Sequence, residues 1–231
     1  MRLLAPLLSL LLCVAPALRA ADAPAAPAPP PNLAPLKKWL AGQAAIRTVQ
    51  ADFVQTRAYR TFNDPIAVPG HLWFAAPHSF RWELGDPPKT VVLRKGDAYY
   101  LIQPTKQRAE RSSVADLGKK AGGPGATPMM DFPLAKNFDD FNRRFEVLSL
   151  ETADGRCHVE MTAKDPQMAK FLNVFKLDFD TGDGHLLSFE FVLKNGSSMR
   201  NEFSNVRLNG KLEPARFDYD FTGYDVTDSK P

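Results

Sequence analysis

The sequence predicts a mainly β fold of about eleven strands, a barrel or a sandwich, with an N-terminal helix and a short helical cover. Three observations predict it. Apolar and polar residues alternate through most of the chain after residue 48. Turn segments at 95–97, 181–184 and 194–196 carry Gly, Asn and Asp, which tolerate positive φ. The 16 phenylalanines and other large residues fall at inward positions, so they form either a filled core or the wall of an apolar cavity.

The N-terminal residues predict export. Arg2, an apolar run over residues 3–17 and small residues at 20 and 21 have the layout of a cleaved signal peptide, residues 1–20. Cys13 follows a leucine, which disfavours lipidation at that cysteine. Residues 21–35 are rich in Pro and Ala and predict an extended linker. Residues 36–231 then suffice for one domain with a sizeable core.

The charge of the exported chain is nearly balanced. Removal of Arg2 and Arg19 with the signal peptide lowers the basic residues from 29 to 27, against 26 acidic residues. We therefore expect no nucleic-acid partner, because the electrostatic footprint of such binding is missing. Cys157 is then the one cysteine left, which excludes a disulfide within the chain.

The first element of the domain is predicted to be an amphipathic helix over residues 34–47. Leu36, Trp39, Leu40 and Ala44 recur at helical spacings, so one side of this helix should lie on an apolar surface.

Strands follow, because the apolar period changes to two. In the C-terminal half Phe175, Leu177 and Phe179 alternate with polar residues, which predicts one apolar and one solvated sheet face. The predicted strands are Thr48–Tyr59, Gly70–Ala75, Ser79–Leu84, Thr90–Arg94, Ala98–Gln103, Phe145–Glu151, Cys157–Ala163, Phe171–Phe179, Leu186–Leu193, Met199–Leu208 and Phe217–Phe221.

Residues 114–143 interrupt the strand pattern. Several glycines and prolines over 118–128 predict a flexible loop. Phe132, Leu134, Phe138 and Phe141 then follow at roughly helical spacings. We expect a loop that leads into a short apolar helix, as in a mobile cover over an opening.

The sequence offers no catalytic or metal motif. It has no G-x-S-x-G elbow and no H-E-x-x-H pair, and its four histidines lie on different predicted strands or turns. The acidic run at 178–184 lacks the spacing of a calcium loop, so a hairpin turn is favoured. Cys157 lies in an alternating strand, which favours a buried thiol over a nucleophile. We expect no enzyme activity, cofactor or metal, although ester hydrolysis by residues from distant strands stays an alternative.

Several segments, in order, resemble the periplasmic lipoprotein carrier LolA and its relatives. A helix containing Leu36–Leu40 is followed by the F-x-Q of Phe53–Gln55. The segment Gly70–Glu83 is similar to the family's G-x-L-W-x-x-x-P-x-x-F-R-W and is the most specific part. Residues 95–104 resemble the next hairpin of the family, and residues 155–221 follow its last strands.

This resemblance implies an open, incomplete antiparallel β-barrel of about eleven strands, with helices closing it over an apolar cavity. It implies a monomeric periplasmic chaperone that takes the acyl chains of lipoproteins from an inner-membrane ABC transporter to an outer-membrane receptor. The alternatives are a paralogue that binds another lipid or a glycolipid, and a periplasmic lipid sensor or scaffold.

Candidate site residues follow from the alternation and the resemblance together. Arg81 is the candidate for a polar contact at the rim or for a salt bridge. Where the family carries an arginine that holds its helical cover, this chain has Ala76. The candidates for the cavity wall are Phe53, Leu72, Phe74, Phe80, Trp82, Leu177, Phe179, Leu187, Phe189 and Phe191.

Overall fold

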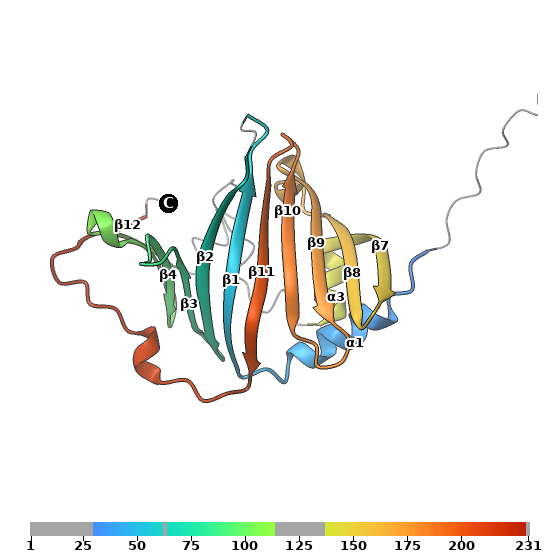
Figure 1. Ribbon diagram of the computed structural model, residues 1–231, viewed down its shortest axis with the longest axis horizontal. Helices are drawn as coiled ribbons and strands as arrows, with labels where there is room; N and C mark the ends of the chain where they lie inside the picture. Colours follow the sequence, from blue (N-terminus) through green and yellow to red (C-terminus); the bar gives the residue numbers. More distant parts are fainter. Residues whose placement is uncertain (1–29, 62–63, 114–136, 230–231) are drawn as a thin grey trace, which may run out of the picture. The chain divides into compact units, whose positions relative to one another are not determined.

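Twelve strands form one sheet in the computed structural model, which describes residues 30–61, 64–113 and 137–229 (Figure 1). Their order across the sheet is β12-β6-β5-β4-β3-β2-β1-β11-β10-β9-β8-β7. The strands are β1 (Thr48–Ala58), β2 (Ile66–Ala75), β3 (Ser79–Leu84), β4 (Thr90–Lys95), β5 (Ala98–Gln103), β6 (Arg108–Ser113), β7 (Phe145–Ala153), β8 (Arg156–Ala163), β9 (Leu172–Asp180), β10 (Leu186–Leu193), β11 (Ser198–Leu208) and β12 (Asp225–Asp228).

The sheet is open, because its outermost strands β12 and β7 do not pair with each other. Neighbouring strands are antiparallel except at one edge, where β12 runs parallel to β6. Strand β1 lies in the interior of the sheet, between β2 and β11. The predicted mainly β fold with an open antiparallel sheet is therefore confirmed, with one parallel pair added.

Two strands are missing from the prediction, and both lie at the β12 edge. Strand β6 reads R-A-E-R-S-S, and only Ala109 in it is buried. All four residues of β12 are exposed. An edge strand with so few apolar contacts lacks the alternation by which a strand is recognised in a sequence.

The strand predicted at Phe217–Phe221 is wrong. Pro214 begins a short 3-10 helix, Pro214–Phe217, and residues 218–221 form no strand. Phe217 is buried there, and Tyr219 and Phe221 pack beside it on the sheet. The alternating aromatic residues that predicted a strand therefore belong to an extended segment. This segment packs across the face of the sheet and does not pair with a strand. Two further 3-10 turns lie at Pro104–Lys106 and Met168–Lys170.

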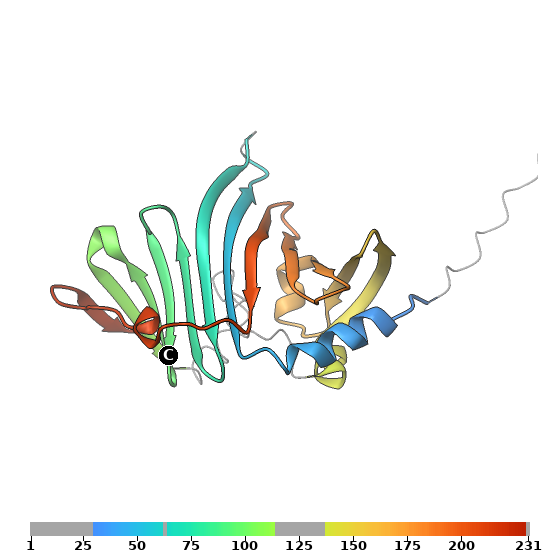
Figure 2. The ribbon, with the colours of Figure 1, turned by 60° about the horizontal axis from the view of Figure 1, so that its bottom comes forward.

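The first half of the sheet carries apolar clusters on both faces, so the solvated face predicted from the C-terminal half does not extend across it. Strands β2, β4, β5 and β6 contribute a second, smaller core on the face that we call outer. The segment that follows β11 runs back past these strands to β12 and covers this core (Figure 2). Its sheet residues are Trp73, Val91, Leu93, Ile102 and Ala109.

Two helices lie near strands β7–β10 (Figure 1). Helix α1 (Ala34–Gln43) begins where predicted but ends four residues before Arg47, and its first two residues belong to the predicted linker. Helix α3 (Phe138–Arg144) is the described end of the predicted cover. The remainder of that cover, residues 114–136, lies outside the described residues, as do the signal peptide and residues 21–29 of the linker. Neither described helix has the length and apolar character needed to cross a bilayer.

Candidate functional site

The larger core of the protein lies on the opposite face of the sheet, which we call inner. It gathers buried side chains from β1–β3, from β7–β10 and from both helices. All the cavity-wall candidates except Leu187 belong to it. We call it the inner cluster; its buried members are Leu36, Trp39, Leu40, Val49, Ala51, Phe53, Leu72, Phe74, Phe80, Trp82, Phe141, Phe145, Cys157, Val159, Met161, Ala163, Leu172, Phe175, Leu177, Phe179, Phe189 and Phe191.

Leu187 lies outside the inner cluster because of an irregularity in β10. The pairing of β10 with β9 shifts register between Leu186 and Ser188. Leu186 therefore packs against the inner cluster, and the Ser188 hydroxyl donates to Asp178. A bulge places two residues opposite one and so interrupts the alternation from which Leu187 was chosen.

Aromatic rings pack closely in the first half of the inner face. The Phe53 ring lies over Gly70, its direct neighbour on β2. Its centroid is 3.8 Å from that of Trp82 and 6.0 Å from that of Phe203. Phe203 was not among the candidates, although its position between the polar residues Glu202 and Ser204 on β11 could have indicated an inward side chain.

A second aromatic group fills the face between β9 and β10. The rings of Phe175 and Phe191 stack with centroids 4.7 Å apart, and Phe189 lies 5.5 Å from Phe191. Phe145 joins Phe175 to Phe141 of α3. These side chains therefore contact one another, so the inner face is a packed core over much of its extent.

Helix α1 is attached to this face by one stack and one carbonyl group. The Trp39 ring stacks on Phe179 with centroids 4.8 Å apart. Its indole Nε1 donates to the carbonyl oxygen of Gly184 at 2.8 Å, and the Gln43 amide donates to the same oxygen at 3.4 Å. The turn between β9 and β10 thus holds the helix.

Ala76 occupies the position where the resemblance implies an arginine. It follows β2, its side chain packs against the inner cluster, and its amide donates to the Arg47 carbonyl at 2.8 Å. A methyl group offers no donor to a cover. Within the described part of the chain, the polar attachment of α1 to the sheet is at Gly184.

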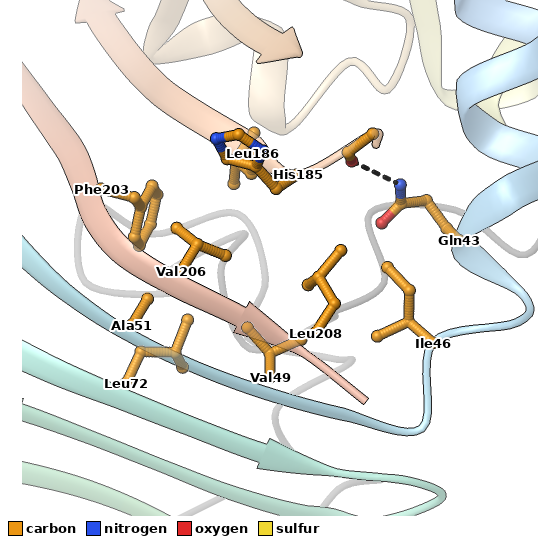
Figure 3. Close-up of a pocket in the computed structure, with 11 residues that line it drawn as sticks. Gln43, Ile46, Val49, Ala51, Leu72, His185, Leu186, Phe203, Val206 and Leu208 are labelled. Atoms are coloured by element: carbon orange, nitrogen blue, oxygen red, sulfur yellow. Dashed lines mark hydrogen bonds between the residues drawn. The ribbon is translucent and has the colours of Figure 1, made fainter. Parts of the chain in front are cut away.

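An apolar pocket opens where α1, β1, β11 and the β9–β10 turn meet (Figure 3). It encloses about 340 Å³ of empty space, part of which is open to solvent. The enclosed part is only about 20 Å³, far below the roughly 300–1,000 Å³ of a ligand pocket, so an acyl chain can enter only if side chains around it move. Its lining is Gln43, Ile46, Val49, Ala51, Leu72, Gly184, His185, Leu186, Phe203, Val206 and Leu208.

His185 and two aspartates form a polar group beside this pocket. The ligand atoms of Asp180, Asp183 and His185 lie within 4.8 Å of one another. The backbone and side chain of His185 both donate to Asp183, which holds the pKa of that carboxyl below its usual value. Asp180 accepts from the amides of Gly182 and Asp183. These oxygens are therefore already used to close the hairpin turn.

The buried thiol lies apart from these polar groups. Cys157 is fully buried on β8, and burial raises its thiol pKa. A raised pKa disfavours the thiolate, which is the nucleophilic form. The histidine next to it in sequence, His158, pairs instead with Asp178.

Arg81 lies on the outer face and not at the rim of the pocket. Its guanidinium forms a salt bridge with Glu83 at 2.6 Å, and both side chains are largely buried. The same group donates to the carbonyl oxygens of Arg216 and Asp218, each at 3.0 Å. Arg81 thus fastens the C-terminal segment over the second core.

Comparison with known proteins gives consistent matches. Residues 44–220 match the family described as outer membrane lipoprotein carrier protein LolA. An outer-membrane lipoprotein carrier protein of Chromohalobacter salexigens is 26% identical over 158 residues, which cover 68% of this chain and 69% of that protein. One from Chromobacterium violaceum is 26% identical over 194 residues, 84% of this chain and 85% of its own length.

Among solved structures, an uncharacterized conserved protein of Thermus thermophilus superposes with a TM-score of 0.53. The superposition covers 84% of this chain and 99% of that one at 9% identity. At this identity the match supports the fold alone.

Proposed function

Since the chain belongs to the LolA family of outer membrane lipoprotein carrier proteins, we propose that it shelters the acyl chains of lipoproteins during their passage through the periplasm. The observation that carries the proposal is the apolar pocket, which shares Val49, Ala51 and Leu72 with the inner cluster of the sheet. Release from an inner-membrane ABC transporter and delivery to an outer-membrane receptor would complete the route. Export by the N-terminal segment would bring the chain to that compartment.

Acyl chains need such shelter for a simple energetic reason. A chain of about fifteen methylenes costs about 12 kcal/mol to expose to water, at about 0.8 kcal/mol each. Transfer between two membranes through water is therefore very slow without a binding protein. If a receptor binds the acyl chain about 1.4 kcal/mol more tightly than the carrier does, the distribution of the chain between the two proteins favours the receptor tenfold.

Under this proposal the end of one chain enters at the pocket, and the rest of the chain takes the space that side chains of α1 now fill. Leu36, Trp39 and Leu40 of this helix fill the inner face. Burial of each such side chain stabilises the protein by about 1.5–3 kcal/mol. An acyl chain that takes their place buries apolar surface of its own and so offsets the burial that these side chains lose. We infer that loading moves α1 away from Phe179 and breaks the hydrogen bond from Trp39 to Gly184.

The test uses two neighbouring leucines. Leu186 lines the pocket, and Leu187, next to it on β10, does not. Leu186→Trp should fill the pocket and lower the lipid that the exported chain retains by at least about fivefold, because the lost burial exceeds 1 kcal/mol. Leu187→Trp is the matched control and should retain lipid as the wild type does. Bound lipid is measured by native mass spectrometry, with circular dichroism to show that both variants fold.

Transfer distinguishes a carrier from a sensor. Wild-type protein loaded with an acylated peptide should pass it to acceptor vesicles. Retention of the peptide in the presence of those vesicles would support a sensor or scaffold. Equal lipid binding by the two tryptophan variants would contradict the assignment of the pocket.

A further inference from the structure

A pair of amide side chains lies in the middle of the inner face. Gln55 of β1 and Asn201 of β11 are direct partners across the strands. Asn201 is also the direct partner of Phe189 on β10, so its side chain lies on the same face as the inner cluster. Gln55 is 4% exposed and Asn201 is 0% exposed. Polar groups buried this deeply among phenylalanines need partners for each donor and acceptor.

Their hydrogen bonds run in one direction, and an arginine sets that direction. Arg57 Nε donates to Gln55 Oε1 at 2.8 Å. Since a guanidinium only donates, the oxygen of Gln55 must face Arg57 and its amide nitrogen must face Asn201. Gln55 Nε2 accordingly donates to Asn201 Oδ1 at 3.0 Å. The orientation of both amides is therefore fixed by chemistry.

The series ends on an unused donor. Asn201 Nδ2 is buried and has no acceptor among the residues that the structure describes. Each donor in such a series polarises the next, so this last N–H group is a strong donor in apolar surroundings. A buried donor without an acceptor is costly, and the binding of an acceptor there removes that cost.

We propose that Asn201 is a binding site for the ester or amide carbonyl at the head of an acyl chain, an inference that rests on the proposed function. The site needs an acceptor that tolerates an apolar environment. A carboxylate would have to lose its hydration among phenylalanines, whereas an uncharged carbonyl oxygen loses little.

The position of Asn201 suits this role. Phe203, two residues away on the same strand, lines the apolar pocket. In the other direction Arg57, which pairs with Met199, is exposed to solvent. An acyl chain with its tail in the pocket and its carbonyl at Asn201 would therefore place its head group towards Arg57 and water.

The experiment compares two lipids with the same hydrocarbon chains, dipalmitoylglycerol and its ether counterpart dihexadecylglycerol. The ether lipid lacks the carbonyl groups. Wild-type protein should bind the ester lipid about tenfold more tightly, since one hydrogen bond to a buried donor is at stake. The double variant Gln55→Leu with Asn201→Leu removes both amides and should bind the two lipids equally. Asn173→Leu, at an exposed position of β9, is the matched control and should keep the preference.

The outcomes separate this inference from the function that it rests on. Binding of neither lipid would overturn the proposed function. Equal binding of both lipids by the wild type, or a preference that persists in the folded double variant, would overturn the carbonyl site alone. If the double variant does not fold, the infrared band of isotope-labelled ester carbonyls decides. Bound to wild-type protein it should shift to lower frequency than in a hydrocarbon solvent, and an unshifted band would refute the hydrogen bond.

Discussion

Replacement of Gly70 by alanine should destabilise the protein strongly, although it adds a single methyl group. The new Cβ would lie 2.6 Å from Phe53 Cε2, and closer still to Phe53 Cζ and to the carbonyl oxygen of Glu83. The oxygen belongs to the backbone of β3, so β2 and β3 must separate by several tenths of an ångström. Such overpacking costs about 1–3 kcal/mol. Displacement of Phe53 from Trp82 adds about 0.5–1.5 kcal/mol for the aromatic pair.

We therefore expect Gly70→Ala to lower the free energy of unfolding by about 3 kcal/mol. For a domain of this size that corresponds to a fall in Tm of roughly 6–12 °C. Gly42→Ala is the matched control: nothing lies within 4 Å of its added Cβ, and it lies in α1. A helical alanine should raise stability by about 0.5 kcal/mol. Thermal unfolding followed by circular dichroism measures both, and a Gly70→Ala variant within about 0.5 kcal/mol of wild type would refute the close approach.

Three further predictions concern the outer face, acid stability and the buried thiol. Arg81→Met leaves Glu83 buried without its partner and frees the C-terminal segment, so it should cost about 2–4 kcal/mol and make that segment sensitive to limited proteolysis. The hydrogen bond from Asn205 holds the pKa of Asp52 below its ordinary 3.8, so its carboxylate stabilises the fold above about pH 4 and less as the pH falls through the lowered pKa. Asp52→Asn should therefore flatten the acid limb of a series of thermal melts. Cys157 should react with a maleimide only after denaturant unfolds the chain, and rapid labelling of the folded protein would contradict its burial.

The long alternating segments could be predicted from the sequence because burial of one face fixes their period. Strands β3, β5 and β10 have the predicted bounds. Side chains such as Trp82 and Phe179 lie on the inner face as their alternation indicates. This information is local, because each strand presents its own pattern of polar and apolar residues.

What could not be predicted depends on contacts between distant segments. Leu187 was misplaced because a bulge in β10 changes which leucine faces inward. The aromatic residues around Phe217 belong to a covering segment, which only the second core explains. The partnership of Gln55 with Asn201 requires the pairing of strands 146 residues apart. No local pattern could indicate it.

The pairing of β1 with β11 also bears on how the chain folds. Strands β2–β6 and β7–β10 are each connected to their neighbours in sequence order, so either group can assemble as a meander soon after it is made. The strands that unite them come from opposite ends of the domain, and their meeting must overcome the entropy of closing a very long loop. Until they meet, each group of strands has an unpaired edge strand and an exposed apolar face, and both features promote aggregation. We therefore expect the central seam of the finished sheet to form late in folding.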